Sequence, residues 1–545
     1  MTGSTSELFT AEEIARYTSA GQWGTAMLSD VVAANAVRIP DSAAFLAEGV
    51  RLTWSEYSKN ANQLARTMTE CNLSPGDRIC VLLPDGPGLH VAYLAAERAG
   101  LVTVGLAVRS GQQEVSRIVL LTGARAILVP KNLRGEDTLE LFDQVRRHCP
   151  ALEYLVQVGE ATGLPFAGPS DPTGEVAVSS RALGPHDLWF INSTSGTTGL
   201  PKCVMHTQAR WMRYHHHVER ACNLTNDDVV MSVVPGVYGF GLWSAHFSPA
   251  LVGSPTVLMP HFDPVAALKE IERHRVTVLV AVTTQFIMML MTKLMQDMDF
   301  SSLRVLFTGG EKIPRERAVE FEELTGAKLL TFYGSNEVGA LAYTTVDDPP
   351  ERRWTTCGRI IEEMNIRLID GTGSEVRDRP GTGQPAGRGP LVAAGYYDDP
   401  EANAALYTPS GDMLMGDIVS IDGEGYLTVV GRTSDFIIRG GKNISAVAVE
   451  QEVGQHPAVA QVAAIPVADP VFGERVCIAV VPAPDQDPDL DQIKEFLRSR
   501  GVSKEWWPEL MMCVSAMPIS VGGKVAKTEL RAMWRERDKN PADSA

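Results

Sequence analysis

The chain has 545 residues, which is enough for two or more packed domains. Hydrophobic residues make up 44% and charged residues 21%, so the chain can bury a large core, and this composition argues against wholesale disorder. The net charge is −17, from 49 Lys and Arg against 66 Asp and Glu, which argues against a protein that coats nucleic acid through an extended basic face.

Cysteine content and hydropathy indicate the cellular compartment. The eight cysteines form no CxxC pair and are typical of reduced thiols. The N-terminal segment lacks the basic start and apolar run of a signal peptide. The most apolar stretch, residues 276–290, is too short and too rich in threonine to span a bilayer. We therefore expect a cytoplasmic protein with no membrane partner and no nucleic-acid partner.

Strand-like and helix-like patterns alternate through most of the chain. The β-branched run RICVLLP (78–84) predicts a buried strand, and GLHVAYLAAERAG (88–100) has apolar residues at helical spacing before a glycine. Further strands are predicted at 102–107, 126–130, 278–282 and 303–310. This order favours α/β layers with largely parallel pairing, which place ligands at the carboxyl ends of the strands.

The pattern changes near residue 365. Short strands at 365–371, 425–432 and 436–441, separated by turn residues, predict an antiparallel, β-barrel-like part. The Gly- and Pro-rich segment 371–390 predicts a loop. Beyond it, helices at 447–457 and 490–500 with strands at 459–467 and 477–484 predict a compact α+β unit. We place the boundary at Asp435, which gives a large N-terminal domain of layered α/β subdomains (1–434) and a small C-terminal domain (435–545).

The segment TSGTTGLPK (194–202) has the composition of a phosphate-binding loop. It follows a predicted strand, and its glycines allow backbone N–H groups to approach an oxyanion closely. Four hydroxyl side chains add hydrogen-bond donors, and Lys202 adds a positive charge. The spacing differs from GxxxxGK[ST], so the chemistry of that common nucleotide loop does not follow.

This loop resembles the signature of the adenylate-forming superfamily, which includes acyl-CoA synthetases, aryl-CoA ligases, adenylation domains and luciferases. Other segments resemble the family's remaining motifs in the expected order, and the resemblance covers nearly the whole chain. These segments are YGSNE (333–337), GD (416–417), GRTSD (431–435), RGGKNI (439–444) and GK (523–524) with LR (530–531) beyond it. The closest overall likeness is to bacterial CoA ligases for alicyclic, aryl and medium-chain acids.

The resemblance implies a two-step reaction, in which a carboxylate attacks the α-phosphate of ATP and a thiol, usually that of CoA, then displaces AMP. Lys524, Glu337 and Arg432 are the implied catalytic residues. Lys524 bridges the carboxylate and the α-phosphate, and Glu337 is the implied Mg²⁺ ligand. Asp417 accepts the ribose hydroxyls, and Tyr333 stacks on adenine. The full nucleotide-binding set that the resemblance implies is Thr194, Ser195, Gly196, Thr197, Thr198, Gly199, Lys202, Gly310, Glu311, Tyr333, Gly334, Ser335, Asn336, Asp417 and Arg432.

The resemblance also implies a mobile C-terminal domain. Asp435 is the implied hinge, about which that domain rotates to present Lys524 for the first step and the glycine loop for the second. Arg439, Gly440 and Gly441 line the implied CoA tunnel, where missing side chains leave room for the thiol arm.

The implied acyl pocket is built mainly from small residues. Tyr238 stands where many relatives have histidine and gates the pocket. Because small residues dominate, we expect a roomy apolar cavity and a bulky hydrophobic acid, such as a polycyclic acid of a natural-product pathway. The pocket residues are Tyr238, Gly236, Gly239, Gly310, Gly339 and Ala340.

The chain departs from the family pattern at several positions, namely Cys203, Asn336, Leu414, Met415 and Ser434. Asn336 replaces a threonine whose hydroxyl contacts the α-phosphate in relatives, although its amide can still donate a hydrogen bond.

These departures leave alternatives open. The enzyme could adenylate poorly and mainly convert a preformed acyl-AMP, supplied by a separate adenylating enzyme, into acyl-CoA. The acceptor could instead be the phosphopantetheine of a carrier protein. A non-catalytic relic that only binds acyl groups or nucleotides is a further reading, against which the retained Lys202, Glu337, Asp417, Arg432 and Lys524 argue. A homodimer is the assembly that the family suggests.

Overall fold

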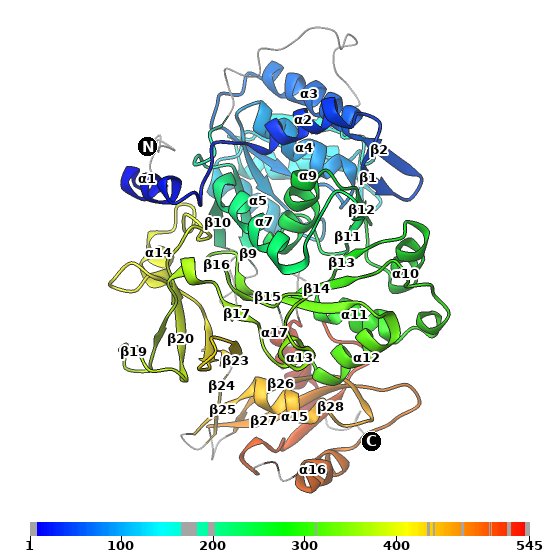
Figure 1. Ribbon diagram of the computed structural model, residues 1–545, viewed down its shortest axis with the longest axis vertical. Coiled ribbons are helices and arrows are strands. Elements are labelled where there is room, and N and C mark those ends of the chain that lie inside the picture. Colours follow the sequence, from blue (N-terminus) through cyan, green and yellow to red (C-terminus); the bar gives the residue numbers. More distant parts are fainter. Residues whose placement is uncertain are drawn as a thin grey trace.

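Four large sheets organise the computed structural model, which describes residues 8–164, 183–194, 202–310, 313–432, 436–439, 442–469, 473–500, 502, 504–519 and 525–539 (Figure 1). The first sheet runs in the order β17 (Arg359–Ile360), β16 (Gly339–Tyr343), β15 (Lys328–Ser335), β14 (Val305–Gly309), β13 (Val278–Val280), β11 (Val230–Ser232), β12 (Thr256–Leu258), β1 (Ala43–Ala47) and β2 (Val50–Thr53). The second runs in the order β10 (Lys202–His206), β9 (Phe190–Thr194), β4 (Val102–Gly105), β3 (Arg78–Val81), β5 (Ala126–Val129) and β8 (Tyr154–Gln157).

Pairing in these two sheets is parallel except at their margins. The strands from β1 through β12, β11, β13 and β14 to β15 are all parallel, and so are those from β9 to β8. β2, β16, β17 and β10 pair in the antiparallel sense. The predicted α/β class with largely parallel pairing is confirmed by these pairings. Parallel neighbours need a crossover connection, which the intervening helices supply.

Helices connect and flank the strands of the large part. They are α1 (Ala11–Ser19), α2 (Leu28–Arg38), α3 (Trp54–Glu70), α4 (Pro87–Arg98), α5 (Gln112–Thr122), α6 (Thr138–His148), α7 (Gln208–Cys222), α8 (Gly239–Gly241), the π-helical η2 (Leu242–Phe247), α9 (Ser248–Val252), α10 (Pro264–Arg273), α11 (Thr283–Leu290), α12 (Arg315–Thr325), α13 (Pro350–Thr355) and α14 (Pro400–Leu406). The long helix α3 shows why such segments start where they do. Glu56 N–H donates to Thr53 Oγ1 at 3.2 Å and the Glu56 carboxylate accepts from Thr53 N–H at 2.9 Å, a capping box.

The third sheet is antiparallel, as predicted for the region beyond residue 365. Its order is β19 (Glu375–Val376), β18 (Arg367–Ile369), β20 (Gly381–Gly387), β22 (Asp417–Ile421) and β23 (Leu427–Arg432), with β21 (Met413–Leu414) beside β20. The prediction of a loop over 371–390 is wrong, because β19 and β20 both lie within it. Close approach explains the glycines of β20. A Cβ at Gly383 would lie 2.8 Å from Ile369 O, and one at Gly387 would lie 2.8 Å from Leu341 Cδ2.

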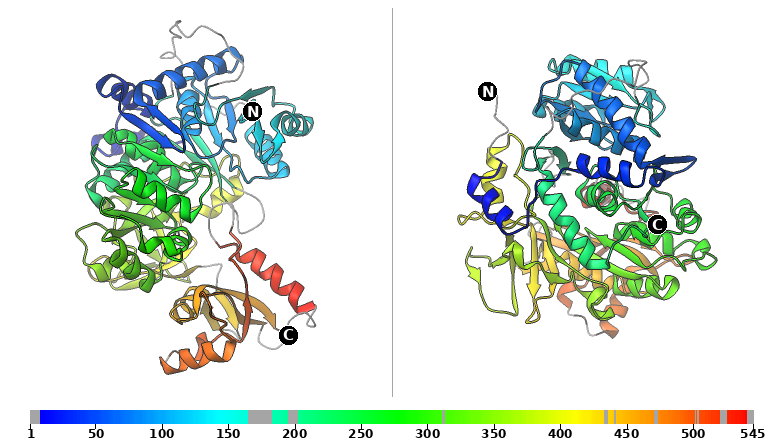
Figure 2. Two further views of the ribbon diagram at one scale, coloured as in Figure 1. Left: turned by 90° about the vertical axis from the view of Figure 1, so that its right-hand side faces the viewer. Right: turned by 45° about the horizontal axis from the view of Figure 1, so that its top comes forward.

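The last sheet forms a separate α+β unit that projects from the rest of the molecule (Figure 2). Its strands are β25 (Lys442–Ser445), β24 (Phe436–Arg439), β27 (Gly473–Pro482) and β26 (Val459–Asp469), with β28 (Leu510–Cys513) parallel to β27, and its helices are α15 (Ala446–Val453), α16 (Leu490–Ser499) and α17 (Lys527–Lys539). The chain passes from the third sheet to this one between Arg432 and Phe436. A large N-terminal part and a small C-terminal part are therefore present, while the predicted boundary residue, Asp435, lies outside the described residues.

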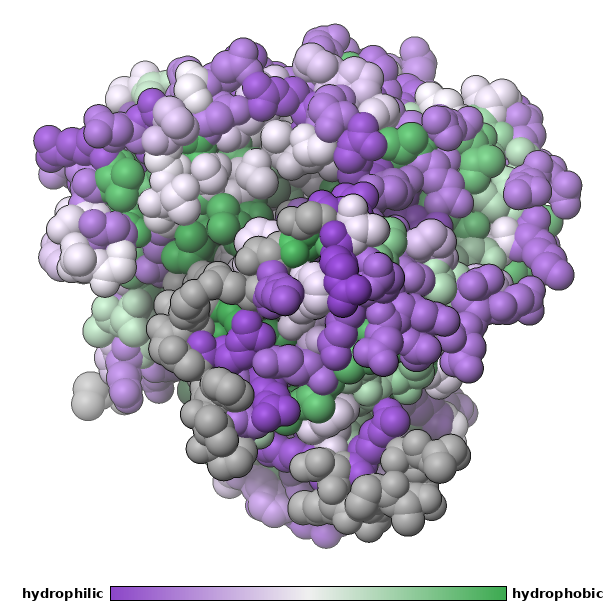
Figure 3. Space-filling view, turned by 90° about the horizontal axis from the view of Figure 1, so that it is seen from below, coloured by the Kyte–Doolittle hydropathy of each residue, from purple (hydrophilic) through white to green (hydrophobic). Residues whose placement is uncertain are grey.

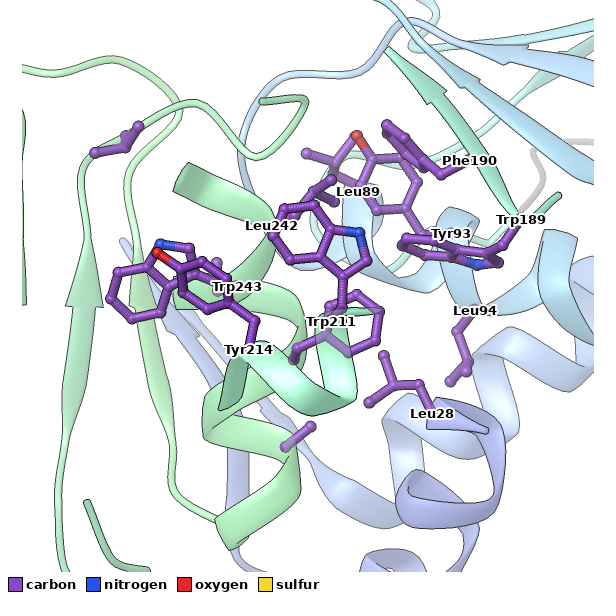
Figure 4. Packing of buried hydrophobic residues seen from close by; sticks show 14 of the residues in the cluster. Leu28, Leu89, Tyr93, Leu94, Trp189, Phe190, Trp211, Tyr214, Leu242 and Trp243 are labelled. Carbon is purple, nitrogen blue, oxygen red and sulfur yellow. The ribbon is translucent and has the colours of Figure 1, made fainter. Parts of the chain in front are cut away.

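The core of the large part is continuous and rich in aromatic rings. Phe190 of β9 packs against Tyr93 of α4 and against Trp189, which precedes the strand. Trp211 of α7 and Trp243 of η2 belong to the same core (Figure 4). The surface seen from below is mostly hydrophilic, with scattered apolar residues (Figure 3). Within the described part of the chain, no helix has both the length and the apolar character needed to cross a membrane.

Candidate active site

A sharp turn between β15 and β16 carries the predicted YGSNE motif. Gly339 has a φ of 78°, a backbone conformation that side chains other than glycine rarely adopt. A Cβ at Gly334 would lie 1.8 Å from Gly339 O, so the two strands approach closely only because this residue has no side chain. Val338 N–H donates to Ser335 Oγ at 3.1 Å and closes the turn. The turn presents Asn336 and Glu337 at the end of the first sheet, next to the edge of the second.

Glu337 is held from both its backbone and its side chain. Ala393 N–H donates to Glu337 O at 2.6 Å, and the Tyr396 hydroxyl donates to Glu337 Oε1 at 2.9 Å. Lys202 Nζ lies 4.8 Å from the centroid of the Tyr396 ring, a cation–π contact. Burial and the charge of Glu337 raise the pKa of Tyr396, so its hydroxyl stays protonated and remains a donor. Lys202 and Glu337 are thus brought together, with Tyr396 between them.

The side chain of Asn336 faces the loop that precedes α8. Gly239 N–H donates to Asn336 Oδ1 at 3.1 Å, and Asn192 Nδ2 lies 3.5 Å from the same oxygen. The backbone oxygen of Asn336 accepts from Arg210 Nη1 at 2.9 Å. The Asn336 turn is therefore attached to α7, to β9 and to the predicted acyl-pocket loop at once.

Arg210 is a buried cation, only 2% exposed, and it also donates to His206 Nδ1 at 2.9 Å. Burial lowers the pKa of Arg210 to about 9, and the charge of Glu337 opposes that shift, so the guanidinium stays charged at neutral pH. Burial and the Arg210 charge lower the pKa of His206 well below its usual value. His206 Nε2 lies 2.9 Å from Asn192 Oδ1. A neutral histidine thus links the cation to the asparagine.

Tyr333 of β15 and Asp417 of β22 are a second pair of predicted residues that meet. The Tyr333 hydroxyl donates to Asp417 Oδ2 at 2.9 Å. Asp417 of β22 is the cross-strand partner of Arg432 of β23, so the backbones of these two residues lie side by side. Two motif residues that are 84 positions apart in the sequence, Tyr333 and Asp417, are therefore joined by a side-chain hydrogen bond.

The glycines of the predicted acyl pocket are closely packed. A Cβ at Gly239 would lie 2.5 Å from Asn336 Oδ1 and 3.1 Å from Trp211 Cη2, and one at Gly339 would lie 2.4 Å from Leu391 O. A Cβ at Gly236 would lie 3.0 Å from Asp85 Oδ1. The small residues at these positions allow neighbouring atoms to approach, so their size is not a measure of an open cavity.

Asp85 adds a carboxyl group beside this loop. Its Oδ1 accepts from Gly236 N–H at 2.6 Å, and burial raises its pKa to about 7 against the effect of that hydrogen bond. Burial raises the pKa of the Tyr238 hydroxyl, and the charges of Glu114 and Asp85 add to that shift. Ala340 is buried, and Gly310 follows β14 with a φ of 82°.

Several predicted residues lie outside the described part of the chain, or have side chains that do. The residues outside are Ser195, Gly196, Thr197, Thr198, Gly199, Glu311, Asp435, Gly440, Gly441 and Lys524. Thr194 and Arg432 are described in their backbones alone. Arg439, predicted for the CoA tunnel, forms an ion pair of 3.0 Å with Glu509 of the C-terminal unit.

Sequence reasoning missed Asn192, His206, Arg210 and Tyr396. Each carried a weak signal. Asn192 is the polar residue of the otherwise apolar run LWFIN, and Tyr396 belongs to the pair GYY. Both are common patterns, so only the fold reveals that they meet the Asn336 turn.

The arrangement has the donors and the carboxylate that a polyphosphate with a divalent cation needs. Glu337 uses Oε1 for Tyr396, and a single hard oxygen ligand suits Mg²⁺, which keeps several waters and phosphate oxygens in its shell. Lys202 and the amide of Asn336 are the cationic and neutral donors nearby. Within the described residues, no group of three or more His, Cys, Asp and Glu side chains forms an alternative metal site.

Comparison with known proteins gives matches along nearly the whole chain. The family described as AMP-binding enzyme matches residues 32–397, and its C-terminal domain matches residues 448–524. A medium-chain fatty-acid–CoA ligase of Escherichia coli (strain K12) is 31% identical over 96% of this chain and 93% of its own length. A 2-hydroxy-7-methoxy-5-methyl-1-naphthoate–CoA ligase of Streptomyces carzinostaticus is 30% identical over 95% of each chain.

Two further likenesses extend these matches. A salicyl-AMP ligase / salicyl-S-ArCP synthetase of Mycobacterium tuberculosis (strain ATCC 25618 / H37Rv) is 29% identical over 97% of this chain and 94% of its own length. Among solved structures, the anthranilate CoA ligase AuaEII in complex with anthranoyl-AMP superposes with a TM-score of 0.83 at 22% identity, covering 94% of this chain and 97% of that one. The superposition shows the same fold.

Proposed function

The chain belongs to the AMP-binding enzyme family and is an AMP-forming acid ligase, and from that premise we propose that it makes an acyl-CoA from a bulky hydrophobic carboxylic acid through an acyl-adenylate. The observation that carries the proposal is the convergence of Lys202, Asn336 and Glu337 through Tyr396, Gly239 and Asn192. A cation, an amide donor and a carboxylate thus lie close together. A nucleotide phosphate and a second anion need such groups for charge neutralisation and for positioning.

The described residues support distinct tasks. Glu337 holds Mg²⁺, which neutralises phosphate charge when it is bound. Lys202 supplies a positive charge close by, and Asn336 supplies an amide donor. Asp417 accepts the ribose hydroxyls, with Tyr333 fixing its carboxylate by the 2.9 Å hydrogen bond.

We extend the proposal to the C-terminal domain, which we define as residues 435–545. Asp435 is the hinge, Lys524 acts in adenylation, and Gly440 and Gly441 admit the thiol after rotation. The separate sheet that begins at Phe436 supports a rigid body able to turn about this point.

The acids used by the relatives and the side chains of the proposed acyl pocket indicate which acids the enzyme accepts. The relatives named above act on a medium-chain fatty acid and on aryl acids, which supports an apolar acid without a formal charge beyond its carboxylate. The Tyr238 hydroxyl and the Asp85 carboxyl give this pocket polar atoms, so a ring hydroxyl on the acid is compatible with it.

The proposal is tested with purified full-length protein, Mg²⁺, ATP, CoA and a panel of acids that runs from octanoate, benzoate, salicylate and cyclohexanecarboxylate to the bulkier 1-naphthoate. Mass spectrometry should detect a CoA thioester that depends on ATP. Glu337→Gln should lower the rate by about 100-fold or more, because a cation ligand near the transferring group is lost. Glu351→Gln is the matched control, since Glu351 is exposed and pairs only with Arg315 in the described residues. Failure to form either an adenylate or a thioester from any acid contradicts the proposal.

A second candidate is favoured by one observation. Asn336 Oδ1, at the position where relatives have a threonine, already accepts from Gly239 and Asn192. An enzyme with this altered contact would make thioester from a supplied acyl-AMP while adenylating weakly. The same assay with synthetic octanoyl-AMP and benzoyl-AMP in place of acid and ATP separates the two functions, and a phosphopantetheinylated carrier protein in place of CoA tests the acceptor.

A further inference from the structure

A series of hydrogen bonds, in which each residue donates to the next, leads to the Asn336 turn. It starts at Arg210 of α7, passes through His206 at the end of β10 and Asn192 in β9, and ends on the side chain of Asn336. A second bond from Arg210 to Asn336 O closes the circuit. We call these four residues the Arg210 ring.

The identities of its end groups fix every donor and acceptor in the ring. A guanidinium only donates, so His206 Nδ1 accepts from Arg210 and the proton of the neutral imidazole sits on Nε2. His206 Nε2–H must then face an oxygen, which is Asn192 Oδ1. Asn192 Nδ2 accordingly faces the backbone oxygen of Val237 at 3.3 Å and Asn336 Oδ1.

The orientation of Asn336 is set independently from the other side. Gly239 N–H can only donate, so the Asn336 atom that faces it must be the oxygen. Both neighbours therefore require the same rotamer and the same amide orientation. The remaining group, Nδ2, has no acceptor among the residues that the structure describes, and the Asn336 side chain is only half-buried.

From this we infer that Asn192, His206 and Arg210 are positioning residues that turn the Asn336 amide so that its Nδ2 donates to an anionic phosphate oxygen of the bound nucleotide. The inference rests on the proposed function, and it assigns roles to three residues that no sequence motif marks. Burial supports it. Asn192 and His206 are 0% exposed and Arg210 is 2% exposed, so bulk water does not compete for these hydrogen bonds.

The test compares the binding of AMP and of adenosine to the full chain by isothermal titration calorimetry. The two probes differ only in the phosphate. In Asn192→Leu, the dissociation constant of AMP should rise about tenfold or more, because a hydrogen bond to a charged group is lost, while that of adenosine should change less than about twofold. The neutral replacement adds no charge that could repel phosphate.

Asn35→Leu is the matched control. Asn35 is also a buried asparagine, 4% exposed, whose Nδ2 donates to Ala250 O at 2.8 Å in a part of the core formed by α2 and α9. It should leave the ratio of the two dissociation constants unchanged, even where thermal unfolding shows a similar loss of stability. A merely structural role of Asn192 predicts the same result for both variants and would overturn the inference.

A double-mutant cycle separates positioning from direct contact. With Asn336→Ala as background, Asn192→Leu should have no further effect on the AMP-to-adenosine ratio, since the group that it orients is absent. Gly239→Ala gives a second route that leaves Arg210, His206 and Asn192 unaltered, because the added Cβ would lie 2.5 Å from Asn336 Oδ1 and displace the Asn336 amide. It should produce the same selective loss of AMP affinity.

The outcomes distinguish this inference from the function on which it rests. If the wild-type protein binds neither AMP nor adenosine, the proposed function and the inference are both overturned. If it binds both and Asn192→Leu and Gly239→Ala leave their ratio within twofold, the inference alone is overturned.

Discussion

Two groups of buried histidines in the large domain differ in how their polar atoms are paired. In the Arg210 ring, both ring nitrogens of His206 have partners, each at 2.9 Å. His90 of α4 and His246 of η2 share one contact, with their Nδ1 atoms 3.2 Å apart. Both Nε2 atoms of this pair are buried and, within the described part of the chain, have no hydrogen-bond partner. Hydrogen bonds therefore hold His206 in its orientation, whereas they account for only one nitrogen of each histidine in the His90–His246 pair.

Aromatic rings stack on both histidines of the His90–His246 pair. Phe45 stacks on His90 at 4.9 Å and Trp189 stacks on His246 at 5.8 Å, with interplanar angles of 13° and 9°. The pair belongs to the aromatic core, where Trp189 packs beside Tyr93 (Figure 4). Here a histidine serves mainly as a flat ring of suitable size, whereas His206 serves as an oriented donor and acceptor. The difference predicts how much each position tolerates an apolar replacement.

The largest effect is expected at Arg210. Arg210→Met leaves buried His206 Nδ1 and half-buried Asn336 O without their donor, and it removes a buried cation that interacts with the charge of Glu337. We expect a loss of about 3 kcal/mol in the free energy of unfolding, since each buried unsatisfied group costs about 1–3 kcal/mol. Urea unfolding followed by circular dichroism measures it. A loss below about 1 kcal/mol would show that the ring is held by packing, as the histidine pair is.

His206→Leu should have the next largest effect. The change preserves approximate volume but leaves Asn192 Oδ1 without a donor in a site that is 0% exposed. We expect a loss of about 2 kcal/mol by the same urea titration. His206→Gln keeps a donor in a comparable place and should recover part of that loss. Equal losses for Leu and Gln would contradict the role assigned to the Nε2–H group.

Much of the fold follows from the sequence because strand and helix patterns are local. The run 78–84 predicted β3, and the apolar spacing of 88–100 predicted α4, now at Pro87–Arg98. The exception, β20, is informative. Its glycines and Pro385 suggest a loop, yet backbone pairing with β18 and β22 on both sides makes it a central strand. That preference is tertiary and leaves no local pattern.

The site was predictable where its residues are adjacent in the chain and not where they are adjacent only in space. Glu337 and Asn336 share one motif, and Asp417 lies in another. Asn192 and Asn336 are 144 residues apart and meet because β9 and β15 end beside each other. A buried asparagine in an apolar strand gives no indication of its partner, so the sequence could name Asn336 and Glu337 as candidate site residues but not the buried residues that contact Asn336.

The smallest effect is expected from replacing both histidines of the stacked pair. His90→Leu/His246→Leu removes a hydrogen bond together with both of its partners and two unpartnered Nε2 atoms. We expect a change below about 1.5 kcal/mol at pH 8, since removing both partners of a buried pair is often nearly neutral and the volumes are similar. Urea unfolding at pH 8 measures it, and a loss comparable with that of Arg210→Met would erase the distinction between the two groups.

The pH dependence of the same variant tests the pair further. Burial lowers the pKa of His90 to about 3, and burial with the neighbouring His90 lowers that of His246 well below its usual value. Between pH 6.5, the ordinary pKa of histidine, and about pH 3, His90 is protonated in the unfolded chain but neutral in the folded protein. Wild-type stability should therefore fall as pH decreases through this window, by about 1.4 kcal/mol per pH unit for each such histidine. The double variant should lose that part of the slope between pH 6 and pH 4.5. An unchanged slope would mean that the pair is already protonated in the folded protein, and that stacking alone does not keep these rings neutral.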